Sequence, residues 1–141
     1  MAGTGFNSFP FSLGMPDQKV YLREANALTV TFAMIETKTA LENVEAIAAT
    51  SGIDALFLGP ADLSIALSNG GDVDPMALEV DRGIERMLAA ARNAGKIMGA
   101  YCHSVERAVA LAKRGVRFLA VGSDMGFLRA GAAAALKVVK G

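Results

Sequence analysis

The sequence has no excess charge of either sign, a single cysteine and a single histidine. Its 141 residues carry 14 Lys and Arg against 14 Asp and Glu. Nucleic acids and anionic membranes are bound through clustered basic side chains, so a neutral chain without a basic stripe argues against both as partners. The lone Cys102 has no partner for an internal disulfide, and we therefore expect a reducing compartment.

The sequence also lacks the signals that direct a chain into or across a membrane. Residues 1–17 have no basic start followed by a continuous apolar core, which a signal peptide would show. No apolar run approaches the roughly 20 residues that span a bilayer. We expect a cytoplasmic chain with one domain, since 52% of its residues are apolar and its length is typical of a single core.

What the sequence does contain is a regular alternation of strand-like and helix-like segments. Residues 1–19 show neither period and predict an irregular N-terminal arm ahead of a domain at residues 20–141, with a short helical stretch around residues 18–27. Apolar, β-branched runs predict strands at residues 27–35, 53–59, 96–102 and 116–122. Helical spacing predicts helices at residues 39–50, 75–93, 104–115 and 124–139, with a long loop at residues 60–74 that has room for one helical turn.

Local signals mark the expected ends of these helices. Thr39 and Glu42 have the spacing of a capping box. Asp74 followed by Pro75 is typical of an N-cap and a first helical residue, and Gly115 is typical of a helix end. The apolar stripe expected in the helix of residues 75–93 consists of Met76, Val80, Ile84, Met87 and Ala91.

The repeated order of strand and helix indicates an α/β fold. Four such units in succession predict parallel strands joined by right-handed crossovers. The strands are continuously apolar rather than alternating, which predicts that both faces of the sheet are covered. Two architectures fit: a small doubly wound sheet, and part of a (β/α)₈ barrel.

Two acidic residues stand where apolar strands end. Glu36 follows the first strand, and Asp62 follows the second after Gly59 and Pro60. Consecutive parallel strands are usually neighbours, about 4.8 Å apart, so both carboxylates could approach one hard divalent cation. The alternatives are structural: Asp62 could cap a short helical turn, and Glu36 could pair with Lys38 or Lys113.

A family resemblance favours the metal site. The stretch MIETKTALENVEAIAATSGIDALFLGPADLS closely resembles the HpcH/HpaI aldolase and citrate lyase family, metal-dependent pyruvate aldolases with a (β/α)₈ barrel. GKIMGAYC and RFLAVGSDMGFL look like the seventh and eighth strand regions of that barrel. The resemblance runs from about Tyr21 to the C-terminus. It implies four parallel βα units that resemble the second half of a TIM barrel.

The resemblance also implies a site and a reaction. Glu36 and Asp62 would bind Mg²⁺ or Mn²⁺, with Co²⁺ as a further option. The amides around Ala61 and Asp62 would hold the carboxylate of a pyruvate-like substrate, with Gly59 allowing close approach. The implied activity is that of a class II aldolase, a carbon–carbon lyase that joins or splits a 2-oxo acid and an aldehyde through a metal-stabilised enolate. No Schiff-base lysine is needed, and Lys96 is expected at the opposite end of the sheet.

The four βα units of this sequence match only the second half of the family's barrel. The residues that the first half of the barrel supplies are therefore missing from the pattern. The family's proton-transferring His and oxo-binding Arg have no matching positions, so the sequence assigns no catalytic residue. His103 follows the third strand, where we expect a loop or the start of a helix, and Tyr101 points either into the pocket or into the core. The alternative function is therefore a non-catalytic metal- or oxo-acid-binding module, or a structural half-barrel subunit.

A half barrel leaves two sheet edges open, which proteins normally avoid. Two copies could complete a barrel, the strands could flatten into an open sheet, or the chain could be a gene fragment. The family's hexamers with swapped C-terminal helices, and the small residues at 130–135, favour a homo-oligomer, with a partner chain that completes the barrel as the other option.

Overall fold

The computed structural model describes residues 17–140. The chain divides between Val30 and Thr31 into two units. In the first unit, α2 (Gln18–Leu28) confirms the expected short helix, and the Asp17 carboxylate caps it by accepting a hydrogen bond from the Lys19 amide at 2.8 Å. Most of the proposed arm of residues 1–19 lies outside the described residues, so its irregular structure and the domain boundary stay predictions.

The second unit is built on four parallel strands: β1 (Phe32–Ile35), β2 (Ala55–Leu58), β3 (Ile97–Cys102) and β4 (Phe118–Val121). They lie in the sheet in the order of the chain, β1-β2-β3-β4. The register aligns Ile35 with Leu58, Leu58 with Ala100, and Ala100 with Leu119. The expected α/β fold of four parallel βα units is therefore confirmed, and sequential strand order is the pattern of a barrel segment.

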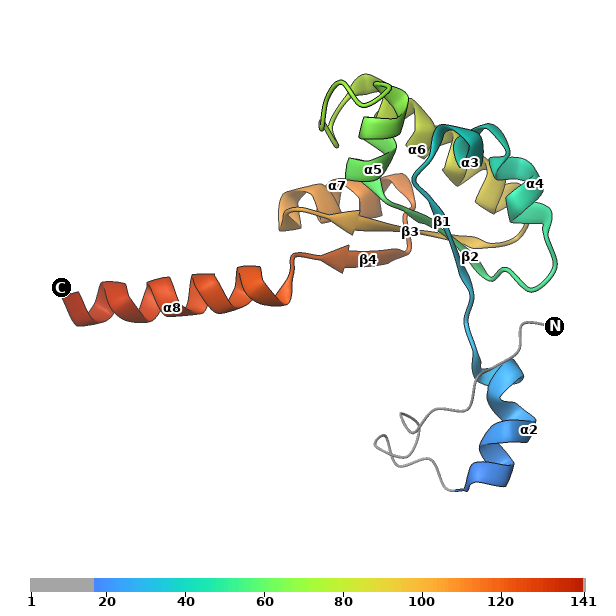
Figure 1. The fold of residues 1–141 in the computed structure, drawn as a ribbon, viewed down its shortest axis with the longest axis horizontal. Coiled ribbons are helices and arrows are strands. Elements are labelled where there is room, and N and C mark those ends of the chain that lie inside the picture. The colour runs from blue at the N-terminus through green and yellow to red at the C-terminus, as the bar shows by residue number, and fades with distance from the viewer. Residues whose placement is uncertain (1–16, 141) are drawn as a thin grey trace. The chain divides into compact units, whose positions relative to one another are not determined.

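The helices of this unit are α3 (Lys38–Glu42), α4 (Val44–Ala49), α5 (Pro60–Leu67), α6 (Leu78–Asn93), α7 (Val105–Arg114) and α8 (Asp124–Lys140). Figure 1 shows α3 to α7 on one side of the sheet. The core lies between them and the strands, and its largest fully buried side chains include Ile35, Leu56, Leu58, Leu63, Ile84, Met87, Met98 and Leu111. None of the helices in the described part of the chain is long and apolar enough to cross a membrane.

The face of the sheet opposite these helices is not covered by any described helix of the second unit. We call it the inner face. It consists of Phe32, Met34, Ala55, Phe57, Ile97, Gly99, Tyr101, Phe118 and Ala120, which alternate with the buried positions along the four strands. The described helices of this unit therefore cover one of the two faces, and the expectation that both faces are covered stays a prediction for the inner face.

Two predicted helix starts are wrong. The helix expected at residues 39–50 is two helices separated at Asn43, and its N-cap is Thr37, whose hydroxyl accepts a hydrogen bond from the Ala40 amide at 3.1 Å. Thr37 therefore takes the place predicted for Thr39, and the capping box with Glu42 does not form.

The helix expected from Pro75 begins at Leu78. Asp74 instead accepts a hydrogen bond from the Met76 amide at 2.9 Å, so its carboxylate closes a turn ahead of α6. Of the predicted stripe, Met76 is exposed, whereas Val80, Ile84, Met87 and Ala91 are buried. The segment of residues 60–74, expected to be mostly loop, opens with the eight residues of α5.

The end of α7 is confirmed, and ion pairs join α6 to its neighbours. Gly115 follows α7 with φ of +107°, a left-handed conformation that favours glycine. Arg114 binds the carboxylates of Asp81 and Glu85 at 2.6 and 2.7 Å, which links α7 to α6. Arg86 binds Glu45 at 2.7 Å, which links α6 to α4. These pairs join α6 to the helices on either side of it.

Candidate metal and oxo-acid site

Glu36 and Asp62 lie at the carboxyl ends of neighbouring strands, as predicted. Glu36 directly follows β1, and Asp62 lies in the first turn of α5, which begins one residue after β2 ends. β1 and β2 pair in parallel up to Ile35 and Leu58. Both acids therefore lie at the same end of the sheet, the carboxyl end of its strands. This end is where (β/α)₈ folds and open α/β sheets place their ligands.

The two carboxylates converge on Gly59. A Cβ atom placed on Gly59 would lie 2.9 Å from Glu36 Oε2 and 3.9 Å from Asp62 Oδ2. Both oxygens are therefore within 4 Å of one point beside the Gly59 backbone. Glu36 is half-buried and Asp62 is exposed, so the pair opens to solvent. Gly59 thus allows a close approach, as expected, but the group that approaches it in the structure is the Glu36 side chain.

Neither carboxylate has a protein partner among residues 17–140. The ion pairs and hydrogen bonds between described residues include none to the Glu36 or Asp62 side chain, so Glu36 does not pair with Lys38 or Lys113 there. Asp62 is also not the N-cap of α5, because Gly59 holds that position. Among the described residues, Glu36 therefore forms no ion pair with a lysine, and Asp62 does not cap a helix.

The N-terminus of α5 carries two amides without a backbone acceptor. The Gly59 amide donates to the Ile35 carbonyl at 3.3 Å, and the Leu63 amide donates to the Gly59 carbonyl at 2.9 Å. Pro60 has no N–H group, which leaves the amides of Ala61 and Asp62 without a described backbone acceptor. Such amides, together with the positive end of the helix dipole, attract a carboxylate.

The carboxyl ends of the strands, which we call the rim, offer oxygen atoms as candidate metal ligands. No group of three or more His, Cys, Asp or Glu side chains with the spacing of a metal site occurs in the part of the chain that the structure describes. Two carboxylates suit a hard divalent ion, which commonly takes one or two carboxylates and completes its shell with water and substrate oxygen. The residues present therefore fit Mg²⁺ or Mn²⁺ better than a metal that needs nitrogen or sulfur ligands.

The residues after β3 lie at the same end of the sheet. His103 is exposed and precedes Ser104, the N-cap of α7, which confirms its place in a loop. Its ring packs edge-on against Tyr101, with the ring centroids 5.2 Å apart. The half-buried Tyr101 belongs to the inner face, whereas Cys102 is fully buried on the helix side. Burial raises the pKa of the Cys102 thiol, with a smaller opposing effect from Arg107, so this thiol is held neutral.

Lys96 lies far from the carboxyl ends of the strands. It precedes β3 and therefore lies at the amino end of the strands, where its Nζ donates a hydrogen bond to the Thr50 carbonyl at 2.6 Å. This placement confirms that Lys96 is at the opposite end of the sheet from Glu36 and Asp62.

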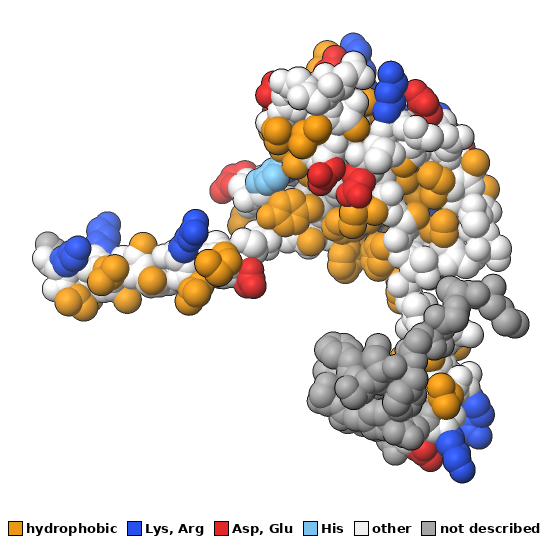
Figure 2. Space-filling view, in the orientation of Figure 1, with side chains coloured by type: hydrophobic (Ala, Val, Ile, Leu, Met, Phe, Trp, Pro, Cys, Tyr) orange, Lys and Arg blue, Asp and Glu red, His pale blue; other side chains and the backbone are white. Residues whose placement is uncertain are grey.

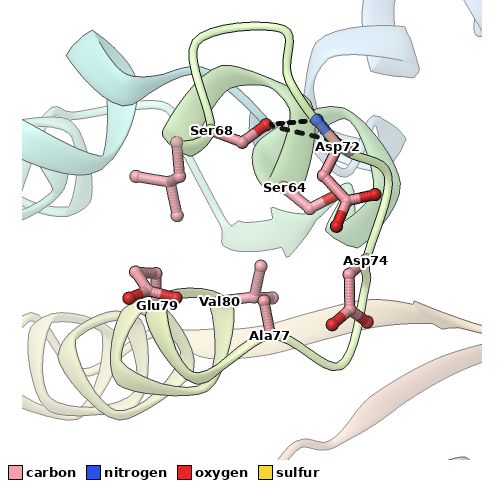
Figure 3. A pocket seen from close by; sticks show the side chains of 8 residues that line it. Ser64, Ser68, Asp72, Asp74, Ala77, Glu79 and Val80 are labelled. Atoms are coloured by element: carbon pink, nitrogen blue, oxygen red, sulfur yellow. Dashed lines mark hydrogen bonds between the residues drawn. The ribbon is translucent and has the colours of Figure 1, made fainter.

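A separate hollow of about 330 Å³ lies between α5 and the start of α6 (Figure 3) and includes Asp72, Asp74 and Glu79. Two of these acids form hydrogen bonds within the α5–α6 connection. The Asp72 carboxylate accepts one from the Val73 amide at 2.7 Å, and the Asp74 carboxylate accepts one from the Met76 amide. The Ser68 hydroxyl bonds to the amide and carbonyl of Asp72, each at 3.0 Å. These contacts build the connection between two helices, and neither Glu36 nor Asp62 lines the hollow.

Fold and site together define part of a (β/α)₈-type barrel with an acidic pair at its carboxyl rim. Residues 14–130 match the model of the HpcH/HpaI aldolase/citrate lyase family, and the chain belongs to this family. It is 38% identical over 109 residues to the 5-keto-4-deoxy-D-glucarate aldolase of Klebsiella pneumoniae and 40% identical over 111 residues to the hydroxypyruvate/pyruvate aldolase of Paraburkholderia phytofirmans. These matches cover 77% and 78% of the chain and 42% of each relative.

One solved structure supports the family assignment, and a more distant one shares the fold. An HpcH/HpaI aldolase/citrate lyase family protein from Burkholderia cenocepacia superposes with a TM-score of 0.80 and 30% identity, over 98% of this chain and 53% of that protein. The citrate lyase β subunit of M. tuberculosis, solved with oxaloacetate and magnesium, shares the fold with a TM-score of 0.57 and 21% identity, over 78% of this chain and 64% of that one. The chain spans about half the length of the curated relatives it matches.

Proposed function

We propose that this chain supplies the cation-binding and carboxylate-binding part of a class II aldolase site for 2-oxo acids of the pyruvate type. The observation that carries the proposal is the convergence of the Glu36 and Asp62 carboxylates on Gly59, beside two free helix amides. The reaction class is supported by family membership and by relatives whose names are those of aldolases.

Glu36 and Asp62 would hold the divalent cation. Their carboxylates are hard oxygen donors without competing partners in the described structure, and such a pair leaves further coordination positions for water and substrate. When bound, the cation would supply a Lewis acid at the keto oxygen of a 2-oxo acid, where negative charge develops as the carbon–carbon bond breaks. The magnesium and oxaloacetate bound by the M. tuberculosis subunit are a cation and a 2-oxo acid of this kind.

The remaining contributions come from the backbone. The amides of Ala61 and Asp62 would bind the substrate carboxylate and orient the 2-oxo acid relative to the two acids, and the α5 dipole would strengthen this binding. Because Gly59 has no side chain, the Glu36 side chain has room beside it. Each of these groups is fixed by the ends of β1 and β2, so the site is positioned by the sheet rather than by a loose loop.

Mn²⁺ binding by the purified chain, followed by electron paramagnetic resonance with and without pyruvate, tests the proposal. We expect the amide variants Glu36→Gln and Asp62→Asn to weaken Mn²⁺ binding about tenfold or more, and pyruvate to strengthen binding to the unchanged chain. Glu79→Gln and Asp74→Asn, which remove acids in the separate hollow, are matched controls and should bind Mn²⁺ normally.

Two outcomes would redirect the proposal. Equal Mn²⁺ binding by Glu36→Gln, Asp62→Asn and the unchanged chain would show that this pair is not a metal site. Binding of Mn²⁺ and pyruvate without cleavage of any 4-hydroxy-2-oxo acid would assign the chain the alternative function, a module that binds oxo acids without turning them over.

A further inference from the structure

Ser64 on α5 is a buried polar residue. Its exposed fraction is 4%, and no other polar or charged residue in the described part of the chain is buried. Its neighbour in the helix, Leu63, belongs to the apolar core. A hydroxyl group in such a place has given up its hydrogen bonds to water, and burying it is costly unless the protein replaces them. The partner of this hydroxyl therefore indicates what Ser64 contributes.

The partner is a peptide group of the candidate site. The Ser64 hydroxyl donates a hydrogen bond to the Ala61 carbonyl at 2.6 Å. This carbonyl and the Asp62 amide belong to one peptide group, and they point in opposite directions from it. The Asp62 amide is one of the two amides of α5 without a described backbone acceptor. Ser64 thus binds one side of the peptide whose other side is free to donate.

The bond acts on the Asp62 amide in two ways. Because a peptide group is planar, a contact that holds its carbonyl oxygen also holds the direction of its N–H group. Hydrogen bonds that share a peptide group also polarise one another, so a donor on the carbonyl oxygen makes the N–H group a stronger donor. Serine hydroxyls in helices often bond to a carbonyl three or four residues back, but here the hydroxyl is buried and the peptide lies at the rim.

Ser64 exerts this effect from the opposite side of α5. Two steps along an α-helix turn it by about 200°, so the side chains of Asp62 and Ser64 leave on opposite sides. Ser64 borders the hollow between α5 and α6 (Figure 3), which does not include Asp62. Its hydroxyl therefore reaches the candidate site only through the peptide group.

A substrate carboxylate needs a well-held donor because its surroundings are acidic. The carboxylates of Glu36 and Asp62 converge on Gly59, the N-cap of α5. Figure 2 shows further acidic side chains at the surface of this unit, among hydrophobic and uncharged ones. Like charges repel each other, so an incoming carboxylate depends on the cation and on the few amide donors of this helix end.

We infer that Ser64 is a positioning residue for the substrate carboxylate. Its hydroxyl holds and polarises the peptide group between Ala61 and Asp62, so that the Asp62 amide donates to that carboxylate. The inference rests on the proposed function, since it takes the Asp62 amide as a carboxylate donor. It adds a residue that touches neither the cation nor the substrate.

Mn²⁺ titrations of the purified chain with and without pyruvate, followed by electron paramagnetic resonance, test the inference. Ser64→Ala removes one oxygen atom and leaves both candidate ligands in place. We expect this variant to bind Mn²⁺ alone as the unchanged chain does. The factor by which pyruvate strengthens Mn²⁺ binding should fall about threefold or more, an effect in the range of one hydrogen bond.

Two further variants separate positioning from folding. Ser64→Thr keeps the hydroxyl, and threonine in a helix makes the same kind of bond to a carbonyl. Its extra methyl group can extend into the hollow of about 330 Å³, so this variant should restore the pyruvate effect. Ser68→Ala is the matched control: it removes a hydroxyl that donates to the Ile65 carbonyl at 3.1 Å, at the other end of α5. It should leave the pyruvate effect unchanged.

The amide itself gives a second measurement that does not depend on Mn²⁺. In ¹H–¹⁵N correlation spectra recorded with Mg²⁺, pyruvate should shift the Asp62 amide resonance of the unchanged chain. Ser64→Ala should move the same resonance upfield before pyruvate is added, because a less polarised N–H group shields its proton more. Thermal unfolding by circular dichroism reports whether each variant is folded.

Failure of the inference and failure of the proposed function give different results. If pyruvate strengthens Mn²⁺ binding equally in the unchanged chain and in Ser64→Ala, only the inference is overturned. It is also overturned if Ser64→Ala melts at a lower temperature and loses Mn²⁺ binding as well, since Ser64 is then needed for folding. If the unchanged chain shows no effect of pyruvate, the proposed carboxylate site fails, and the inference fails with it. Selective loss of the pyruvate effect, restored by Ser64→Thr, supports the inference.

Discussion

Replacing Gly59 with alanine adds one carbon atom at the point where the two candidate ligands meet. The new Cβ would lie 2.9 Å from Glu36 Oε2 and 3.0 Å from Glu36 Cβ, whereas carbon atoms pack at about 3.5 to 4.0 Å. The φ of −95° at Gly59 is one that alanine adopts freely. The cost therefore comes from the contact, and overpacking of this kind costs about 1–3 kcal/mol.

The contact can be relieved only in part. The carboxylate at the end of the Glu36 side chain can rotate away, but its Cβ is fixed to the backbone that ends β1. We therefore expect Gly59→Ala to lower the melting temperature by about 4 °C for each kcal/mol and to weaken Mn²⁺ binding about tenfold, because the displaced carboxylate no longer faces Asp62. The assays are thermal unfolding by circular dichroism and Mn²⁺ titration.

Gly131→Ala is the matched control for this substitution. No atom lies within 4 Å of the Cβ that it would add to α8, and alanine is the better helix former by about 1 kcal/mol. It should leave Mn²⁺ binding unchanged and should not lower stability. If Gly59→Ala melts and binds Mn²⁺ like the unchanged chain, Glu36 is not held against Gly59. A lower melting temperature with unchanged Mn²⁺ binding would mean that Glu36 is not a ligand.

Two further predictions concern the helical layer. The Arg86 hydrogen bond lowers the pKa of Glu45 from 4.5 to about 2, so the stabilisation from this pair is complete above pH 4.5 and is lost as the pH falls towards 2. The difference in urea midpoint between Glu45→Gln and the unchanged chain should shrink over that range and in high salt, and a constant difference would contradict the reasoning. Ser104→Ala removes the hydroxyl that accepts from the Arg107 amide at 3.2 Å and should cost about 1 kcal/mol in urea unfolding, whereas Ser104→Asp should retain the cap.

The positions of the two acids could be predicted from the sequence because strand ends are visible in it. The apolar runs that end at Ile35 and Leu58 are interrupted by Glu36 and by Gly59–Pro60, and parallel pairing forces such ends to one edge. That Gly59 accommodates the Glu36 side chain could not be predicted, since this depends on the distance between two backbones. A glycine followed by proline at a strand exit was the available signal.

The helix caps show where local sequence does not suffice to predict the structure. Thr37 and Thr39 are both capable N-caps, and Thr37 is selected because the chain leaves β1 at Ile35 and turns into α3 almost at once. Asp74 likewise has the chemistry of a cap but closes the turn ahead of α6. Each residue keeps its preference for binding a free amide, and the surrounding fold decides which amide is presented.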